Sequence, residues 1–213
     1  MMNRSQVTNR AVVQAIVLMV ASHIHAYADW PQFRGNNSSG HGDGVLPSKF
    51  GPGVNEIWSV DLKPGHSSPS IVGDSLFVTS FDRQQKQLAV VCLNCIDGQI
   101  RWTYPIKIDA IEKGHPSFNP ASSSPASDGQ RVVAYFGSYG LIYLSMRGEK
   151  LWEIKMPLTK SYAGNATSPA IYDDQVILYR GNHVDHFLLA VDKETSVERW
   201  RRVRLDQLES MIS

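Results

Sequence analysis

The stretch "HSSPSIVGDSLFVTS" (residues 66–80) returns twice in the chain, as "SSPASDGQRVVAYF" from Ser123 and as "TSPAIYDDQVILYR" from Thr167. In every copy a Ser-Pro pair is followed four residues later by a turn residue and then by an apolar run rich in β-branched side chains. The prolines are Pro69, Pro125 and Pro169, and the turn residues are Gly73, Gly129 and Asp173. A pattern that recurs in register indicates one structural unit used several times.

Each copy closes with a second shared signature, a turn followed by a tryptophan. The segments are "NCIDGQIRW", "LSMRGEKLW" and "DKETSVERW", which end at Trp102, Trp152 and Trp200. An earlier tryptophan, Trp58 in "NEIWSVDL", precedes the first copy in the same phase. Successive tryptophans are 44, 50 and 48 residues apart, which is the spacing of four-stranded propeller blades rather than of helical or leucine-rich repeats.

The pattern inside one copy predicts four short strands. In the first copy they are expected over 67–71, 75–81, 87–94 and 99–106, separated by turns that contain Gly, Asp, Gln and Lys. Apolar runs that are interrupted so regularly by turn residues favour an all-β architecture, and no window shows a sustained helical period. Single sheets of this kind bury both faces only when they stack radially. The sequence therefore predicts a β-propeller with four-stranded blades.

The repeat boundaries divide the chain into a lead-in segment, residues 29–55, and a partial propeller, residues 56–213. Three blades are expected at approximately 66–106, 121–156 and 166–204, with one leading strand around Trp58 ahead of them. The sequence therefore predicts an incomplete ring. Residues 50–62 are expected to be poorly anchored, and both terminal blades are expected to expose unpacked surface.

The periodic tryptophans are predicted to fasten each sheet to its neighbour. An indole buries a large apolar area at low rotameric cost, which suits this role. A glycine four residues earlier favours a tight turn at positive φ, and in the third copy Ser196 takes its place. The candidate docking residues are Trp58, Gly98, Trp102, Gly148, Trp152 and Trp200. The alternative is that the tryptophans form an aromatic platform for a ligand.

Residues 1–28 have the organisation of a secretory signal peptide. Arg4 and Arg10 precede the apolar run "AVVQAIVLMVA", and "AYA" ends at Ala28 with the small residues of a cleavage site. The chain is therefore expected to be exported to the periplasm or the extracellular space after cleavage following Ala28; the alternative is an uncleaved N-terminal anchor. The Gly-, Asn- and Ser-rich residues 29–44 are expected to be a mobile lead-in, although its "WPQFRG" could pack on the propeller as a cap.

Several ordered segments, among them "DWPQFRGNNSSG", "IWSVDL", "GHSSPSIVGDSLFVTS" and "NATSPAIYDDQVILY", resemble exported bacterial β-propellers with pyrroloquinoline-quinone-like (PQQ-like) repeats. The resemblance is to the members abundant in planctomycete-type bacteria, and it covers nearly all of the chain after residue 28. It implies a propeller fold and, for most members, no quinone chemistry. Relatives include the propeller scaffold of the outer-membrane protein assembly machinery. That scaffold is a lipoprotein, and no lipidation cysteine follows the apolar run here, so the specific role does not transfer.

Quinone dehydrogenases of this fold hold PQQ together with Ca²⁺ through carboxylate and amide oxygens, often beside two adjacent cysteines that form a disulfide. No such set of residues is matched in this sequence. The cysteines, Cys92 and Cys95, are three positions apart, so on a strand they would point to opposite faces, and they are predicted to pack as two partly buried thiols. No catalytic residue is predicted, the cofactor-binding residues stay unknown, and no cofactor is expected; PQQ with Ca²⁺ belongs to the alternative below.

The segment "GNHVDHF" contains a local cluster of residues that can ligate metals. His183, Asp185 and His186 are types that bind zinc and other divalent ions. They fall where a polar hairpin tip is expected, and alternation puts His183 and Asp185 on one face and His186 on the other. They stay candidates, and no metal site is predicted.

Charge and composition limit the partners. The formal net charge is +1 and no basic stripe is present, which argues against nucleic acid or an anionic membrane as the main partner. The sequence therefore favours a non-catalytic exported propeller that serves as a binding or scaffold module for an unidentified protein or polysaccharide. The alternative is a PQQ-dependent dehydrogenase-like quinoprotein or a truncated fragment of one.

Overall fold

The computed structural model describes residues 29–42, 44 and 46–203, so the expected signal peptide, residues 1–28, lies outside the described residues. No helix within those ranges is long and apolar enough to span a bilayer. The regular structure there consists of one short 3-10 turn, η1 (Asn36–Ser38), and twelve β-strands.

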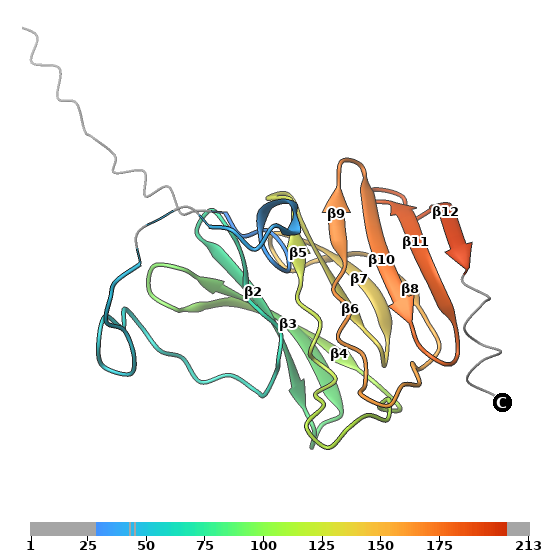
Figure 1. Cartoon of the computed structure of the whole chain (residues 1–213), viewed down its shortest axis with the longest axis horizontal. Coiled ribbons are helices and arrows are strands. Elements are labelled where there is room, and N and C mark those ends of the chain that lie inside the picture. The colour runs from blue at the N-terminus through green and yellow to red at the C-terminus, as the bar shows by residue number, and fades with distance from the viewer. Residues whose placement is uncertain (1–28, 43, 45, 204–213) are drawn as a thin grey trace, which may run out of the picture.

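The strands form three four-stranded antiparallel sheets, each with its strands in chain order (Figure 1). Blade 1 comprises β1 (Ser70–Val72), β2 (Ser75–Asp82), β3 (Gln87–Asn94) and β4 (Ile100–Lys107); blade 2 comprises β5 (Ala126–Ser127), β6 (Arg131–Phe136), β7 (Gly140–Ser145) and β8 (Lys150–Lys155); blade 3 comprises β9 (Ala170–Tyr172), β10 (Gln175–Gly181), β11 (His186–Asp192) and β12 (Glu198–Val203). The main contacts between strands of different blades join the first strands, β1 to β5 and β5 to β9. These inner strands converge while the outer strands spread apart, which is the radial arrangement of an incomplete β-propeller.

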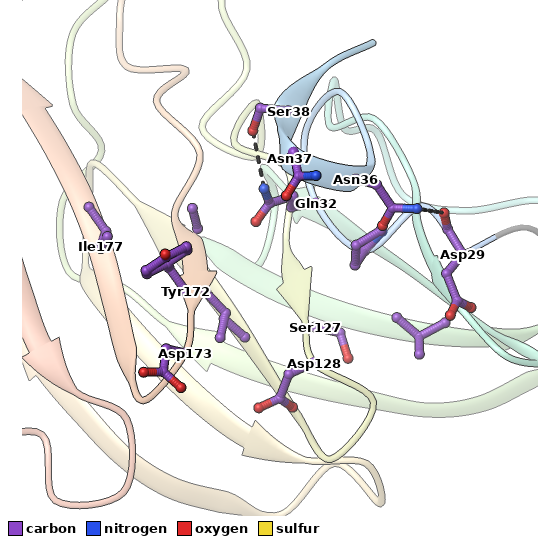
Figure 2. A pocket seen from close by; sticks show the side chains of 14 residues that line it. Asp29, Gln32, Asn36, Asn37, Ser38, Ser127, Asp128, Tyr172, Asp173 and Ile177 are labelled. Atoms are coloured by element: carbon purple, nitrogen blue, oxygen red, sulfur yellow. Dashed lines mark hydrogen bonds between the residues drawn. The ribbon is translucent and has the colours of Figure 1, made fainter. Parts of the chain in front are cut away.

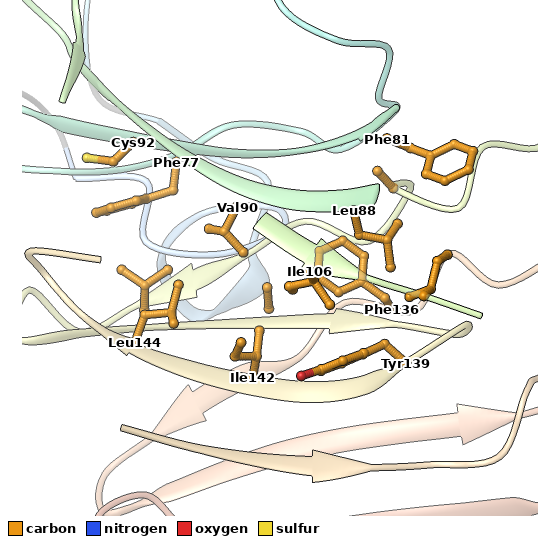
Figure 3. Packing of buried hydrophobic residues seen from close by; sticks show 14 residues of the cluster. Phe77, Phe81, Leu88, Val90, Cys92, Ile106, Phe136, Tyr139, Ile142 and Leu144 are labelled. Atoms are coloured by element: carbon orange, nitrogen blue, oxygen red, sulfur yellow. The ribbon is translucent and has the colours of Figure 1, made fainter. Parts of the chain in front are cut away.

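Alternating side chains of the middle blade fill two separate cores. On β6, Val132, Ala134 and Phe136 pack against blade 1, whereas Val133 and Tyr135 pack against blade 3. Figure 3 shows the first of these clusters, between the sheets of blades 1 and 2. Because side chains of a strand point alternately to opposite faces, one apolar run supplies both interfaces of the blade. This explains why these strands read as continuous apolar runs and not as an alternation of apolar and polar residues.

A relay of serine hydrogen bonds links the inner ends of the three blades. The backbone N–H of Ser68 donates to Ser124 Oγ (2.9 Å), and the backbone N–H of Ser124 donates to Ser168 Oγ (2.9 Å). Each of these serines directly precedes the proline of its copy. The Ser-Pro signature therefore recurs because it joins blades. The strand predicted over 67–71 is correspondingly shorter, since β1 begins only at Ser70 once the preceding residues bond to other partners.

Each outer strand contains a β-bulge that is not evident from the sequence pattern. In β4 the pairing register shifts between its partners Cys92 and Leu93, which leaves Arg101 unmatched in the ladder. Leu151 in β8 and Arg199 in β12 are unmatched in the same way. Each unmatched residue directly precedes the tryptophan of its copy. A bulge bends its strand and re-aims the following side chain, so the same irregularity orients all three indoles.

The expected leading strand around Trp58 pairs with no other strand among the described residues, and no strand is assigned between residues 55 and 69. The segment is held by side chains instead. The indole of Trp58 reaches the turn that follows β3, and Val60 packs on the outer face of blade 1. Ile57 and Leu62 beside them remain exposed.

Candidate functional site

A pocket of about 620 Å³ opens where the inner strands of blades 2 and 3 meet residues close to the start of the described chain (Figure 2). We call it the inner-strand pocket. Its lining residues are Asp29, Pro31, Gln32, Asn36, Asn37, Ser38, Val72, Ser127, Asp128, Ala170, Ile171, Tyr172, Asp173 and Ile177. The volume lies within the range of about 300–1,000 Å³ that is common for ligand pockets.

One wall of the inner-strand pocket is built by residues 29–40, which we call the docked segment. Trp30 and Ile71 of β1 exchange two backbone hydrogen bonds (2.8 and 2.9 Å), so the segment extends the inner edge of blade 1. The carbonyl of Pro31 accepts the N–H of Ser127 at the inner edge of blade 2 (2.8 Å). The expectation of a mobile lead-in is therefore wrong over residues 29–40, which are attached to two blades. The alternative, in which "WPQFRG" packs on the propeller, is the one observed.

The docked segment owes its shape to a tight turn beneath the Trp30 ring. Gly35 has φ +70°, and a Cβ there would lie 2.5 Å from Trp30 Cε3, so only glycine fits under the indole. The turn continues into η1, where Asn37 and Ser38 both have φ +53°. Positive φ at non-glycine residues stores strain and persists only where surrounding bonds hold it, often at functional sites. The polar side chains of η1 are thus presented to the pocket on a fixed backbone.

The pocket combines one exposed aromatic ring with polar groups that lack partners. Tyr172, at the end of β9, is 70% exposed. The side-chain amide of Asn37 and the carboxylate of Asp173 make no hydrogen bond within the described part of the chain. Asp173 also has positive φ, +55°. Figure 2 shows how these side chains face the pocket from the docked segment and from blade 3.

The electrostatics of the pocket are acidic. Among its lining residues Asp29, Asp128 and Asp173 are carboxylates, and none is Lys or Arg. Burial by itself would raise the pKa of Asp128, but hydrogen bonds from the backbone N–H of Gln130 and from Lys193 Nζ (3.0 Å) outweigh it, so this pKa lies below its ordinary value. Asp128 is therefore ionised and already paired.

The indole N–H groups of three tryptophans, Trp58 in the segment before blade 1 and two on outer strands, each reach a backbone carbonyl in a turn of the blade that follows. The bonds run from Trp58 Nε1 to the carbonyl of Cys95 (2.8 Å), from Trp102 Nε1 to that of Met146 (2.9 Å) and from Trp152 Nε1 to that of Lys193 (2.8 Å). Trp200 instead donates to Gln175 Oε1 of its own blade at 3.2 Å.

Gly98 and Gly148 lie directly beneath two of these indoles. A Cβ at Gly148 would be 2.7 Å from Trp102 Cδ2, and a Cβ at Gly98 would be 2.5 Å from Trp58 Cε3. Both glycines also have positive φ, +71° and +81° in chain order, so each is required by the backbone and by the ring above it. Ser196 occupies the same place in blade 3 with φ +61°.

The metal-ligand candidates His183, Asp185 and His186 lie at the hairpin between β10 and β11. Asp185 Oδ1 accepts a hydrogen bond from Arg180 Nε at 2.6 Å, and His186 Nε2 pairs with the Tyr179 hydroxyl at 2.6 Å. The structure does not bring the three together as a ligand set: within the described ranges no group of three or more His, Cys, Asp or Glu could hold a metal ion.

Two buried charged residues were missed by sequence reasoning. Arg180, at the end of an apolar run, is fully buried and donates from Nη1 to the Tyr135 hydroxyl (2.8 Å), which links blades 2 and 3. Glu112 in the connection between blades 1 and 2 is 5% exposed, and neither of its carboxylate oxygens has a partner in the described residues. Burial raises the pKa of Glu112 to about 8, with the nearby Arg180 opposing the shift.

The two cysteines are free thiols in different surroundings. Cys92 is buried in the core between blades 1 and 2, and burial raises its pKa to about 11. Cys95 lies in the turn after β3 and is half-buried. Burial also raises the pKa of Cys95, so both thiols hold their protons more tightly than a free cysteine. Cys92 packs in the core as an apolar group, whereas Cys95 belongs to none of the buried clusters of the described residues.

Comparison with known proteins gives a family match. The family described as outer membrane protein assembly factor BamB matches residues 44–210. No curated protein matches the chain.

Solved structures with a similar fold share little sequence with this chain. BamB from Moraxella catarrhalis is 16% identical with a TM-score of 0.48, over 69% of this chain and 39% of that protein. A europium-containing methanol dehydrogenase is 17% identical with a TM-score of 0.46, over 67% and 25%. The computationally designed Ika4 protein is 13% identical with a TM-score of 0.45, over 71% and 79%. The chain thus spans well under half the length of the first two proteins.

The family match covers most of the chain, including all three blades with their Ser-Pro and tryptophan signatures. The chain belongs to the PQQ-like repeat β-propeller family represented by BamB.

Proposed function

We propose that this chain is a non-catalytic, exported β-propeller module that binds its partner at the inner-strand pocket. The observation that carries the proposal is the combination of an exposed Tyr172 ring with the polar side chains of Asn37 and Asp173, which have no hydrogen-bond partner in the described residues. Their backbone is held by the docked segment and by blade 3. Ligand sites are typically concave and carry a few polar groups fixed by the scaffold. Family membership supports a propeller module and leaves its ligand open.

Export is part of this proposal. Its support is the positively charged, apolar N-terminal stretch with a cleavage signal after Ala28. A module released in this way would act in the periplasm or outside the cell.

The second candidate function, a quinone-dependent dehydrogenase, fits the pocket poorly. PQQ carries several carboxylate groups, and an anionic cofactor needs cationic or N–H donors around it. The lining residues of the inner-strand pocket include no Lys or Arg to bind the carboxylates of the quinone. Two of the three lining carboxylates are also engaged, Asp128 with Lys193 Nζ and Asp29 with the N–H of Gly73, which leaves few ligands for the Ca²⁺ that accompanies PQQ. No His–Asp pair or other base–nucleophile pair is found among these lining residues either.

The test compares binding and catalysis in one preparation. The purified chain is titrated with PQQ and Ca²⁺ and assayed for dye-linked alcohol oxidation, and it is passed over immobilised glycans and peptides representative of envelope polymers. We expect no stoichiometric quinone binding, no oxidation, and retention on one class of polymer. Tight quinone binding with oxidation, or retention on no polymer at all, would overturn the proposal.

A further inference from the structure

We propose that the inner-strand pocket recognises a neutral polysaccharide, with one sugar ring stacked on Tyr172 and its hydroxyls bonded to the amides and carboxylates around it. This inference rests on the proposed function, because it names the ligand class of the same pocket. It is argued from the exposure of the ring, the chemistry of the polar groups and the charge of the lining.

The first step concerns the aromatic ring. Tyr172 is the last residue of β9, the inner strand of blade 3, and yet it is 70% exposed. A large ring left open inside a concave site offers a flat apolar face. The C–H faces of pyranose rings are flat, weakly apolar surfaces of matching size. The ring is therefore a platform for a sugar and not a part of the core.

The second step concerns hydrogen-bond chemistry. Sugar hydroxyls both donate and accept, so a site for them needs acceptors and donors side by side. Asp173 contributes a carboxylate that only accepts, and Asn37 contributes an amide that does both. Gln32 and Asn36 each use the amide nitrogen internally, in bonds to Ser38 Oγ (3.1 Å) and to the carbonyl of Asp29 (3.3 Å), which leaves their amide oxygens for a ligand.

The third step concerns charge. No cationic side chain lines the pocket, so uronic acids, sulfated sugars and phosphates would meet carboxylates without a balancing positive charge. A basic peptide is attracted by the same carboxylates, but two of the three are engaged: Asp128 pairs with Lys193, and Asp29 Oδ1 accepts the N–H of Gly73 (2.9 Å). Within the described residues only Asp173 among the three makes no hydrogen bond or ion pair, so a single carboxylate is left for a basic peptide. The mixture of groups therefore fits a neutral polyol better than a cation.

The experiment uses the purified chain and isothermal titration with maltohexaose, cellohexaose and a neutral galactan oligosaccharide, with oligogalacturonate and hexalysine as charged probes. We expect at least one neutral oligosaccharide to bind with an affinity that is unchanged between low and high salt, because screening acts only on charges. Tyr172→Ala should weaken binding about tenfold or more, and Tyr172→Trp should preserve it.

Isosteric variants separate the polar contributions. Asp173→Asn replaces a carboxylate acceptor by an amide donor, and Asn37→Asp replaces an amide donor by an acceptor. Each keeps the side-chain shape and tolerates positive φ, so each should weaken binding several-fold. Tyr162→Ala is the matched control, since Tyr162 is 84% exposed and lies outside the pocket. It should leave the affinity unchanged, and circular dichroism should show every variant folded.

The outcomes distinguish this inference from the proposed function. Hexalysine binding that depends on Asp173 and falls with salt, without glycan binding, overturns the glycan inference and keeps the binding module. Glycan binding that survives Tyr172→Ala overturns the assignment to this pocket. If neither the oligosaccharides nor the charged probes bind and the polymer panel also retains nothing, both proposals fall.

Discussion

The glycine beneath an indole is a residue at which the structure tolerates little change. Gly148→Ala would place a methyl group 2.7 Å from Trp102 Cδ2 at a residue with φ +81°. Gly73→Ala is the matched control, because Gly73 also has positive φ but nothing lies within 4 Å of its Cβ position. Both variants carry the backbone strain of about 1–2 kcal/mol, and we expect Gly148→Ala to lose about 1–3 kcal/mol more through overpacking. Urea unfolding measures the difference in unfolding free energy between the two variants. Equal losses would show that the indole moves aside without an energetic cost.

The serine relay predicts that stability depends on the Ser124 hydroxyl. Ser124→Ala removes the acceptor of the Ser68 N–H, and we expect it to cost about 1 kcal/mol of unfolding free energy. Ser70→Ala is the control, because Ser70 is fully buried and its hydroxyl has no partner in the described residues. That change should be neutral or stabilising. Thermal unfolding of both variants checks the contrast, and a greater loss at Ser70 would contradict it.

The buried carboxyl of Glu112 predicts a pH dependence of stability. Its pKa in the folded chain, about 8, lies above the ordinary value of 4.5, so between these values the folded state holds a proton that the unfolded state releases. Stability should therefore fall as pH rises from 4.5 to 8, by about 1 kcal/mol per pH unit. The groups near the carboxyl are the Arg180 guanidinium and the hydroxyls of Thr159 and Tyr135, while Ser138 Oγ accepts the backbone N–H of Glu112 (3.0 Å).

The test for Glu112 is a difference between two pH profiles. Glu112→Gln keeps the shape of the side chain but does not titrate, so its stability should decline less over the same pH range. Urea midpoints collected for both proteins at several pH values give the two slopes. Parallel profiles would mean that Glu112 ionises normally in the folded chain.

At the scale of elements, the bulged outer strand and its tryptophan form the joint between blades. Trp102→Phe removes a hydrogen bond that crosses from blade 1 to blade 2, whereas Trp200→Phe removes one within blade 3. The abandoned Gln175 amide can turn to water, but the backbone carbonyl of Met146 has less freedom. We expect Trp102→Phe to cost about 1 kcal/mol more than Trp200→Phe. Equal unfolding free energies for the two variants would show that the hydrogen bond between blades 1 and 2 stabilises the fold no more than the bond within blade 3.

The elements also show where sequence reasoning succeeds and where it stops. The strands expected over 75–81 and 87–94 correspond to β2 (Ser75–Asp82) and β3 (Gln87–Asn94), because apolar runs and turn residues are local signals. The bulge at Arg101 and the shortening of β1 depend on partners in other strands or blades, which no local pattern encodes. The local sequence therefore predicts that a strand exists, whereas hydrogen bonds to other strands and blades decide where it begins and ends.

The pocket shows the same limit at a larger distance. Its residues come from the docked segment, from the ends of β1 and β5 and from blade 3, so its two main walls lie more than a hundred residues apart in the sequence. Tyr172 and Asp173 stand in the repeated stretch as a strand end and a turn residue, and nothing in that stretch separates them from their structural equivalents. Asn37 lies opposite them because the docked segment is hydrogen-bonded to Ile71 of blade 1 and to Ser127 of blade 2.

At the scale of the whole molecule, stability should be graded across the blades. Repeat architectures behave as chains of units coupled to their nearest neighbours. Blade 2 is covered on both faces, while blade 3 leaves Tyr179 46% and Leu188 37% exposed on its open face. We expect hydrogen–deuterium exchange to be slowest in β6 and β7 and faster in β9 and β12. Uniform protection across all three blades would instead indicate a single cooperative unit.

The serine relay has a polarity with an evolutionary consequence. The same residue supplies the donor toward one side and the acceptor toward the other, as Ser124 does for Ser168 and Ser68. A tandem duplication of the encoding DNA therefore produces a new blade that already carries both halves of its junctions, head to tail, without compensating mutations elsewhere. Recombination within such a gene therefore adds or removes whole blades together with the hydrogen bonds that join them.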